Sequence, residues 1–186
     1  MELKYRSGPA KMVKSHIKLP WLNYAHIKHT NKAFNSTTIL EDGTGQITGT
    51  LGEMAFGRWL MDMDIDFDYC ADSSMNYDFV VGGYRVDVKS KKALDKHGEP
   101  RDDFTLRIPC SQKNQDCDIY VFTYVYSKDV YLLGSMEKSD FWGYYGHDVK
   151  AGEKTGNFTE RQDARLAYIR DLTDMERLEI LLRNRE

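Results

Sequence analysis

The sequence predicts an α/β domain in which a central mixed β-sheet is flanked by helices. Three observations lead to this fold class. An apolar stripe at helical spacing precedes two β-rich runs that are separated by Gly82-Gly83. A third β-rich run, residues 118–126, follows a connection from Ser90 to Asp118 that is long enough to cross over to a parallel neighbour. A capped helical segment near the C-terminus completes the order of elements.

The first predicted helix covers residues 48–61, because apolar residues recur there at a spacing of three to four. The run from Asp62 to Tyr69 alternates acidic and apolar residues, so its later part is expected to form a strand. Residues 77–81 and 84–90 are β-rich, and the two glycines between them are a strong signal for a hairpin turn. The apolar stripe of the helix consists of Leu51, Met54, Ala55, Trp59 and, as a further candidate, Phe56.

The rest of the sheet is predicted from residues 104–136. Residues 104–108 follow a charged loop and are expected to be extended up to Pro109. Residues 118–126, with the sequence DIYVFTYVY, are the most strand-like run of the chain. Residues 130–136 are expected to form the hairpin partner of this strand.

The C-terminal part is expected to be less regular. Residues 137–165 combine a short helix near Lys138 with loops that glycines interrupt. Thr173 and Glu176 form a capping-box pattern, which opens a final helix that ends at about Leu182. The residues of this helix that are expected to face inward are Met175, Leu178, Leu181 and Leu182.

The bulk composition is that of one globular domain. The chain has 186 residues, of which 41% are hydrophobic and 30% are charged, and it can bury a core without disulfide or metal cross-links. No apolar stretch approaches the roughly 20 residues of a membrane span, and the N-terminus lacks the apolar segment of a secretory signal. Three cysteines make an odd number. We therefore expect reduced thiols, no membrane partner and a cytoplasmic location.

Charge is distributed unevenly along the chain. The net charge is −3, but residues 1–40 hold seven basic residues against one acid, a net +6, so that residues 41–186 carry −9. We interpret residues 1–45 as a basic N-terminal arm and residues 46–186 as a single α/β domain. A basic arm on an acidic body can bind a polyanion. The alternative is that the arm is simply a solvated segment.

The turn at Gly82-Gly83 predicts the register of the hairpin. Val81 then pairs with Tyr84, and three pairs further along Asp78 lies opposite Asp87. Side chains alternate between the two faces of a strand, and a shift by one residue would mix the faces. One face receives Tyr77, Phe79, Val81, Tyr84, Val86 and Val88, and the other receives Asp78, Val80, Arg85, Asp87 and Lys89.

The pairing of Asp78 with Asp87 has a chemical consequence. Their Cβ atoms would lie roughly 5 Å apart, and two carboxylates at that distance repel each other unless a cation compensates. Mg²⁺ binds through one or two carboxylates and completes its octahedron with water and phosphate oxygens. Lys89, on the same face, adds a positive charge that could stabilise a phosphoryl group or orient the attacking water. The alternative is a strand-edge Asp78 beside a solvated face.

These residues resemble the signature of the PD-(D/E)XK nuclease superfamily, in particular its small phage and restriction-associated members. The signature is an acid on one strand of a hairpin and acid-any-lysine on the next, here Asp78 and Asp87-Val88-Lys89. The superfamily often adds a glutamate from the preceding helix, and Glu53 is similar to it. The resemblance covers about residues 48–136. Asn76-Tyr77 stands where the superfamily has proline before its first acid.

The resemblance implies a restriction-endonuclease-like fold and a Mg²⁺-dependent endonuclease or exonuclease, with Mn²⁺ as a substitute. Such an enzyme hydrolyses nucleic-acid phosphodiesters, and DNA is the expected polymer. Asp78, Asp87 and Glu53 would bind the metal, and Lys89 would be the catalytic cation. A homodimer is left open, and a phage-encoded protein would act in the host cytoplasm. The alternatives are a catalytically inactive nuclease-fold module for DNA binding or assembly, and an interaction protein whose carboxylate pair is accidental.

Several basic residues outside the hairpin are candidates for contacts with the phosphate backbone. A solvated charged loop is the alternative for those that follow the hairpin. The candidates are Lys91, Lys92, Lys96 and Arg101 after the hairpin, and Lys11, Lys14 and Lys18 in the arm.

Four alternating aspartates before the hairpin look like a cation-binding loop. An EF-hand loop needs glycine at its sixth position and an acid at its twelfth, and Phe67 and Ser73 stand there. We therefore expect a solvated strand face. The four residues are Asp62, Asp64, Asp66 and Asp68.

Overall fold

The computed structural model describes residues 12–16, 44–70, 76–93, 98–126, 129–156 and 158–184. The main sheet is built from six strands: β1 (Val13–His16), β2 (Phe67–Tyr69), β3 (Phe79–Val81), β4 (Tyr84–Lys92), β6 (Ile119–Tyr126) and β7 (Asp129–Glu137). Their order across the sheet is β1-β7-β6-β4-β3-β2. Only β4 and β6 among these neighbours are parallel. The predicted mixed α/β fold with a mixed sheet is confirmed.

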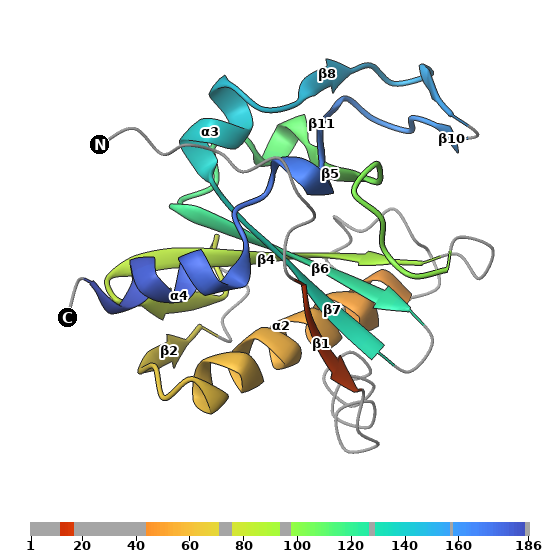
Figure 1. Ribbon diagram of the computed structural model, residues 1–186. Coiled ribbons are helices and arrows are strands. Elements are labelled where there is room, and N and C mark those ends of the chain that lie inside the picture. The colour runs from red at the N-terminus through yellow and green to blue at the C-terminus, as the bar shows by residue number, and fades with distance from the viewer. Residues whose placement is uncertain are drawn as a thin grey trace.

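The remaining elements cover the two faces of this sheet. The helices are α2 (Thr44–Asp62), α3 (Lys138–Gly143) and α4 (Met175–Arg183), and short 3₁₀ turns lie at η2 (Cys110–Gln112) and η3 (Ile169–Asp171). A second sheet has the order β5-β11-β8 and consists of β5 (Thr105–Pro109), β8 (His147–Val149) and β11 (Ala164–Tyr168). A two-stranded sheet pairs β9 (Lys154–Thr155) with β10 (Phe158–Thr159). Figure 1 shows α2 below the main sheet and α3 with the second sheet above it.

Helix α2 is held close to the sheet by small residues. Leu51, Ala55 and Trp59 from the predicted stripe are buried, with Phe56 and Leu60 beside them. A Cβ on Gly52 would overlap the hydroxyl oxygens of Ser90 and Thr123, so the helix backbone approaches β4 and β6 closely. The helix begins four residues before the predicted start, because its first turn lacks the apolar spacing on which the prediction depends.

The hairpin forms with the predicted turn. Gly82 and Gly83 both have positive φ, at 52° and 75°, which a type I′ turn requires. Val81 pairs with Tyr84, and the ladder continues to Phe79 opposite Val86, as predicted.

The ladder ends there, so the predicted pairing of Asp78 with Asp87 is wrong. The Asp78 N–H donates to Val86 O at 2.9 Å, although the ladder partner of Val86 is Phe79 and not Asp78. The Asp78 carboxylate accepts the N–H of Val88 at 2.7 Å, so a side-chain oxygen stands where a strand partner would supply a carbonyl. Asp78 is nevertheless held against β4.

Gly82→Ala is expected to destabilise the protein more than Gly83→Ala. Each substitution places an L residue in the left-handed region, at a cost of about 1–2 kcal/mol. A Cβ on Gly83 meets no described atom within 4 Å, whereas one on Gly82 overlaps the carbonyl oxygen of Leu182 in α4. Urea denaturation of the two variants measures the difference. Equal losses would contradict the close approach of the turn to α4.

The connection between β4 and β6 makes the predicted crossover to a parallel neighbour. Strand β6 is buried on both faces, which explains why its sequence shows no alternation of polar and apolar residues. Ile119 and Val121 face α2 and α4, whereas Tyr120, Phe122 and Tyr124 belong to the second core cluster under β5, β11 and α3.

Part of the predicted basic arm belongs to the main sheet. Strand β1 pairs antiparallel with β7, and Lys14 Nζ lies 2.8 Å from Asp129 Oδ2. The predicted boundary at residue 45 falls inside α2, which begins at Thr44. The rest of the arm lies outside the described residues.

The C-terminal region shows where the predictions were too coarse. Helix α3 forms near Lys138 as predicted, but strands β8 to β11 replace the expected loops. These strands have two to five residues, too few to produce a periodic pattern.

The predicted capping box of α4 is wrong. Asp174 caps the helix and accepts the N–H of Arg177 at 2.9 Å. Thr173 instead exchanges two backbone hydrogen bonds with Ser135. Met175, Leu178 and Leu182 are buried as predicted, and Leu181 is partly buried. No helix within the described ranges is long and apolar enough to cross a membrane.

Candidate active site

Four side chains from three elements meet at the start of the hairpin. Helix α2 carries Glu53, the residue before β3 is Asp78, and β4 carries Asp87 and Lys89. The hydroxyl of Tyr69, in β2, donates to Glu53 Oε2 at 2.7 Å and so orients that carboxylate. The fold thus brings together the four residues that the sequence singled out. Asp78 is held by its hydrogen bond with Val88 and not by the predicted ladder pair with Asp87.

The pKa of the Asp78 carboxyl group is raised by its surroundings. Burial raises its pKa well above the usual value, and the negative charges of Glu53 and Asp87 raise it further. The hydrogen bond from Val88 N–H and the charge of Lys89 act in the opposite direction but do not compensate. Three carboxylates and one ammonium therefore share one electrostatic environment.

Asp87 and Lys89 form an ion pair that is largely shielded from water. Lys89 Nζ lies 2.6 Å from Asp87 Oδ2, and Asp87 is 6% exposed. Asp87 Oδ2 is buried, and beyond this ion pair the described residues supply no hydrogen bond to it. The Lys89 ammonium donates instead to Gln115 Oε1 at 3.3 Å. Asp87 thus retains capacity for a further cation or donor.

The donor set fits a hard divalent cation. Mg²⁺ and Mn²⁺ prefer carboxylate oxygens, and Asp78 and Asp87 offer them beside each other, with Glu53 near. Within the part of the chain that the structure describes, no three His, Cys, Asp or Glu side chains are already arranged around one ion. Mg²⁺ needs only one or two protein carboxylates. Asp78 and the buried Oδ2 of Asp87 are therefore the first candidates to hold it.

The raised pKa of Asp78 predicts that the metal-free protein loses stability as pH rises. The folded state binds this proton more tightly than the unfolded chain does. The resulting stabilisation is complete below the ordinary pKa of 3.8 and disappears as pH rises through the raised folded-state value. Asp78→Asn should remove this dependence and stabilise the metal-free protein at neutral pH, because the amide oxygen can still accept the N–H of Val88.

Urea denaturation with a chelator present, from about pH 4 to about pH 8, measures this effect. Asp68→Asn is the control, since Asp68 is exposed on β2. A variant at position 78 with the wild-type pH dependence would show that another group titrates.

The predicted phosphate contacts have mixed outcomes. Lys91 Nζ donates to Thr105 O at 2.9 Å, and burial of the ammonium, together with the charge of Arg107, lowers its pKa. Lys92 is exposed and, by strand alternation, lies on the face of β4 opposite to Lys89 and Lys91. Lys91 therefore continues the row of Asp87 and Lys89 on one face of β4, and Lys92 does not; both phosphate contacts stay predictions.

Two other predicted contacts form ion pairs within the protein. Arg101 pairs with Asp103, with its Nε 3.1 Å from Oδ1, and Lys14 pairs with Asp129. Lys11, Lys18 and Lys96 lie outside the described residues.

Sequence reasoning missed the residues that surround Lys89. Tyr120 lies opposite Asp87 in the β4–β6 ladder, and the Lys89 ammonium lies 5.9 Å from the centroid of its ring. Burial, followed by the charge of Asp87, raises the pKa of the Cys117 thiol to about 11. Tyr120 could have been found by extending the register of the sheet, but no pattern marks Gln115, which lies in a loop.

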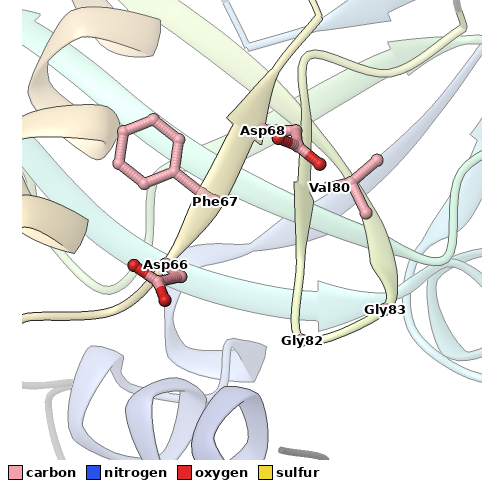
Figure 2. A pocket seen from close by; sticks show the side chains of 6 residues that line it. All are labelled: Asp66, Phe67, Asp68, Val80, Gly82 and Gly83. Carbon is pink, nitrogen blue, oxygen red and sulfur yellow. The ribbon is translucent and has the colours of Figure 1, made fainter.

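The four aspartates before the hairpin are exposed, as expected for a solvated face. Asp66 and Asp68 border a hollow of about 430 Å³ together with Val80 and the turn glycines. Figure 2 shows the Asp68 carboxylate on the side of β2 that faces Val80, Asp66 at the start of β2, and the Phe67 ring pointing away from Asp68. The residues that line this hollow do not include the acids of the candidate active site.

No family model, curated protein or solved structure matches this chain. The chemistry of the candidate active site is therefore argued from its own residues and their geometry.

Proposed function

We propose that the protein is a Mg²⁺-dependent nuclease that hydrolyses phosphodiester bonds of nucleic acid, with DNA as the expected polymer and a restriction-endonuclease-like arrangement of its site. One observation carries the proposal. The negative charges of Glu53 and Asp87 both act on the buried Asp78, and Lys89 forms an ion pair with Asp87. A buried group of like charges destabilises a fold and is expected where a site must bind a cation.

Each residue has a role that its contacts favour. Asp78 and Asp87 would hold the cation, with the Asp78 carboxylate fixed by the N–H of Val88. A bound Mg²⁺ would supply a more acidic water and would neutralise charge on the phosphate. Glu53, oriented by Tyr69, would accept a hydrogen bond from the attacking water.

Lys89 would stabilise the negative charge that develops on the phosphoryl oxygens in the transition state. Its ammonium is already placed by Gln115 Oε1 and by the face of Tyr120. A group that is positioned before the reaction needs little reorganisation when the charge appears.

Cleavage of a panel of substrates tests the function. Supercoiled plasmid, linear duplex, single-stranded DNA, branched DNA and RNA are each incubated with Mg²⁺, with Mn²⁺ and with a chelator. We expect cleavage of at least one substrate with either metal and none with the chelator. Asp68→Asn, on the exposed face of β2, is expected to cleave like the wild type.

Binding of DNA without cleavage under every condition would contradict the proposal. That outcome would favour an inactive nuclease-fold module. Calorimetry with Mn²⁺ tests the second alternative, an interaction protein with an accidental carboxylate pair, because that alternative predicts no metal binding.

A further inference from the structure

A second hollow lies next to the candidate active site. It has a volume of about 830 Å³ and is bordered by the start of β4, the segment before β6 and the start of α3. Three of its lining residues carry the argument: Lys113, Lys138 and Trp142. Its size is within the range of about 300–1,000 Å³ that small-ligand sites have.

Two paths of direct contact join this hollow to the acids. Gln115 accepts the ammonium of Lys89 with its side chain and the ammonium of Lys138 with its backbone carbonyl. Asp87 lies opposite Tyr120 in the sheet, and the Tyr120 hydroxyl accepts Trp142 Nε1–H at 3.1 Å. A ligand in contact with Lys138 or Trp142 would therefore be linked through Gln115 to Lys89 and through Tyr120 to Asp87.

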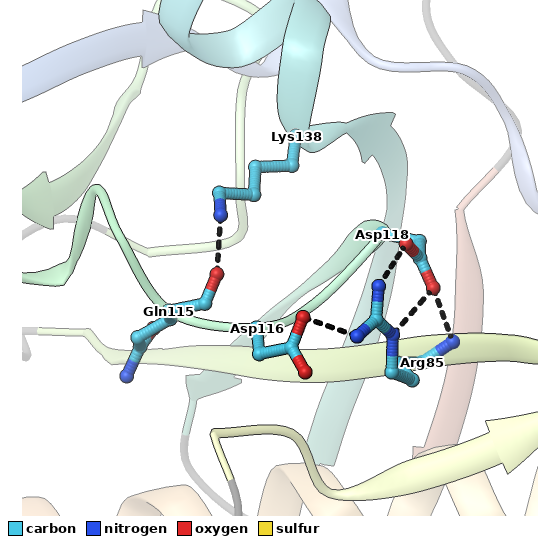
Figure 3. A network of polar contacts seen from close by, with 5 residues as sticks. All are labelled: Arg85, Gln115, Asp116, Asp118 and Lys138. Carbon is cyan, nitrogen blue, oxygen red and sulfur yellow. Dashed lines mark hydrogen bonds and ion pairs between the residues drawn. The ribbon is translucent and has the colours of Figure 1, made fainter.

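One wall of the hollow is rigid, and its lining carries both signs of charge: Arg85, Lys113 and Lys138 against Asp118 and Glu137. Figure 3 shows Arg85 between Asp116 and Asp118, with Asp118 accepting from its Nε at 3.0 Å and from its Nη2 at 2.8 Å. These carboxylates neutralise Arg85 and fix the segment before β6. Lys138 donates to the Gln115 carbonyl and its charge also acts on Asp118, whereas Lys113 lies on an exposed side chain over the Trp142 ring.

The half-buried indole of Trp142 lines the hollow. The ring is held in place by Tyr120 and by an edge-to-face contact with Phe141 at 5.3 Å. The Lys113 ammonium lies 5.8 Å from the ring centroid on an exposed side chain that can move aside. A fixed indole with two nearby ammonium groups matches a nucleobase with its adjoining phosphate.

We propose that this hollow binds one unstacked nucleotide of the substrate strand, next to the phosphodiester that is cut, so that single-stranded or displaced-strand DNA is the preferred substrate. The base stacks on Trp142, and Lys113 and Lys138 contact the phosphate. A paired base inside a duplex cannot offer its face, because its neighbours cover it. The placement beside the cleaved bond rests on the proposed nuclease function, whereas binding of the nucleotide does not.

Fluorescence anisotropy of a labelled oligothymidine of about 12 nucleotides tests the binding. The full chain is used with a chelator, so that no cleavage intervenes, and a duplex of equal length is measured beside it. We expect the single strand to bind more tightly than the duplex. Trp142→Leu should weaken single-strand binding about tenfold, and Trp142→Tyr should restore most of it. Lys113→Glu should weaken it severalfold, and Lys154→Ala, on β9, should bind like the wild type.

The outcomes separate this inference from the proposed function. Wild-type affinity in both Lys113→Glu and Trp142→Leu, or equal affinity for single strand and duplex, would overturn the inference even if the protein cuts DNA. Because Lys113 is exposed, its variant keeps the test valid if Trp142→Leu does not fold. Loss of single-strand binding in the variants of a protein that cuts nothing would support the binding site and refute the nuclease.

Discussion

Asp87→Asn is expected to remove most metal binding and to lower cleavage by more than 100-fold, without loss of the fold. The expected loss exceeds the roughly 10–100-fold that removal of a group behind a metal ligand causes, because Asp87 would be a ligand itself. Its Oδ2 is one of two buried side-chain oxygens without a hydrogen-bond donor among the described residues, the other being Gln112 Oε1. An amide at this position has similar volume but no charge, so it cannot replace a carboxylate toward Mg²⁺.

Calorimetry with Mn²⁺ measures the binding directly and does not depend on activity. Stability of the metal-free variant should stay near that of the wild type. The substitution removes a close ion pair with Lys89, but it also removes a charge that raises the pKa of Asp78. Asp68→Asn provides the control for loss of a carboxylate in general. Undiminished Mn²⁺ affinity in the Asp87 variant would exclude Asp87 as a ligand.

The hairpin was predictable because its signals are local. Gly82-Gly83 determines the turn, and alternation then places Asp87 and Lys89 on one face, as the structure shows. The position of Asp78 was not predictable in detail. Counting residue pairs from the turn extends the β3–β4 ladder without a limit. In the structure the ladder ends at Phe79, and the Asp78 carboxylate accepts the hydrogen bond that a backbone carbonyl would otherwise accept. Asp78 lies next to β4 both in the predicted register and in the structure, so it lies near Asp87 in either case.

The surroundings of the site depend on contacts that are distant in sequence. Gln115 reaches Lys89 from a loop 26 residues away, and no periodicity marks a loop residue. Charge alone also does not show which partners the predicted phosphate contacts have within the protein. Lys14 and Arg101 have carboxylate partners, and Lys91 bonds a carbonyl of β5. A sequence shows that a lysine is present but not which partner the fold supplies.

Lys89→Ala is expected to lower the single-turnover cleavage rate by about 100-fold or more, the scale for removal of one preorganised electrostatic group. If the ammonium stabilises charge that exists only in the transition state, its loss changes the rate far more than substrate binding. The variant should still bind Mn²⁺ through Asp78 and Asp87, and its affinity for DNA should be nearly unchanged. Lys89→Arg should not restore the full rate, because a planar guanidinium does not replace a compact ammonium.

The competing interpretation makes Lys89 a structural partner that neutralises Asp87, to which it lies 2.6 Å away. In that case Lys89→Ala would destabilise the metal-free protein. Bound metal would compensate for the lost positive charge, so the single-turnover rate at saturating enzyme and metal would approach that of the wild type. Lys91→Ala, two residues along the same strand face, gives the matched control for loss of a lysine that already bonds Thr105 O. A single-turnover rate for Lys89→Ala that equals that of Lys91→Ala would remove Lys89 from the chemistry. A rate about 100-fold lower, with intact Mn²⁺ binding, would place its ammonium at the transition state.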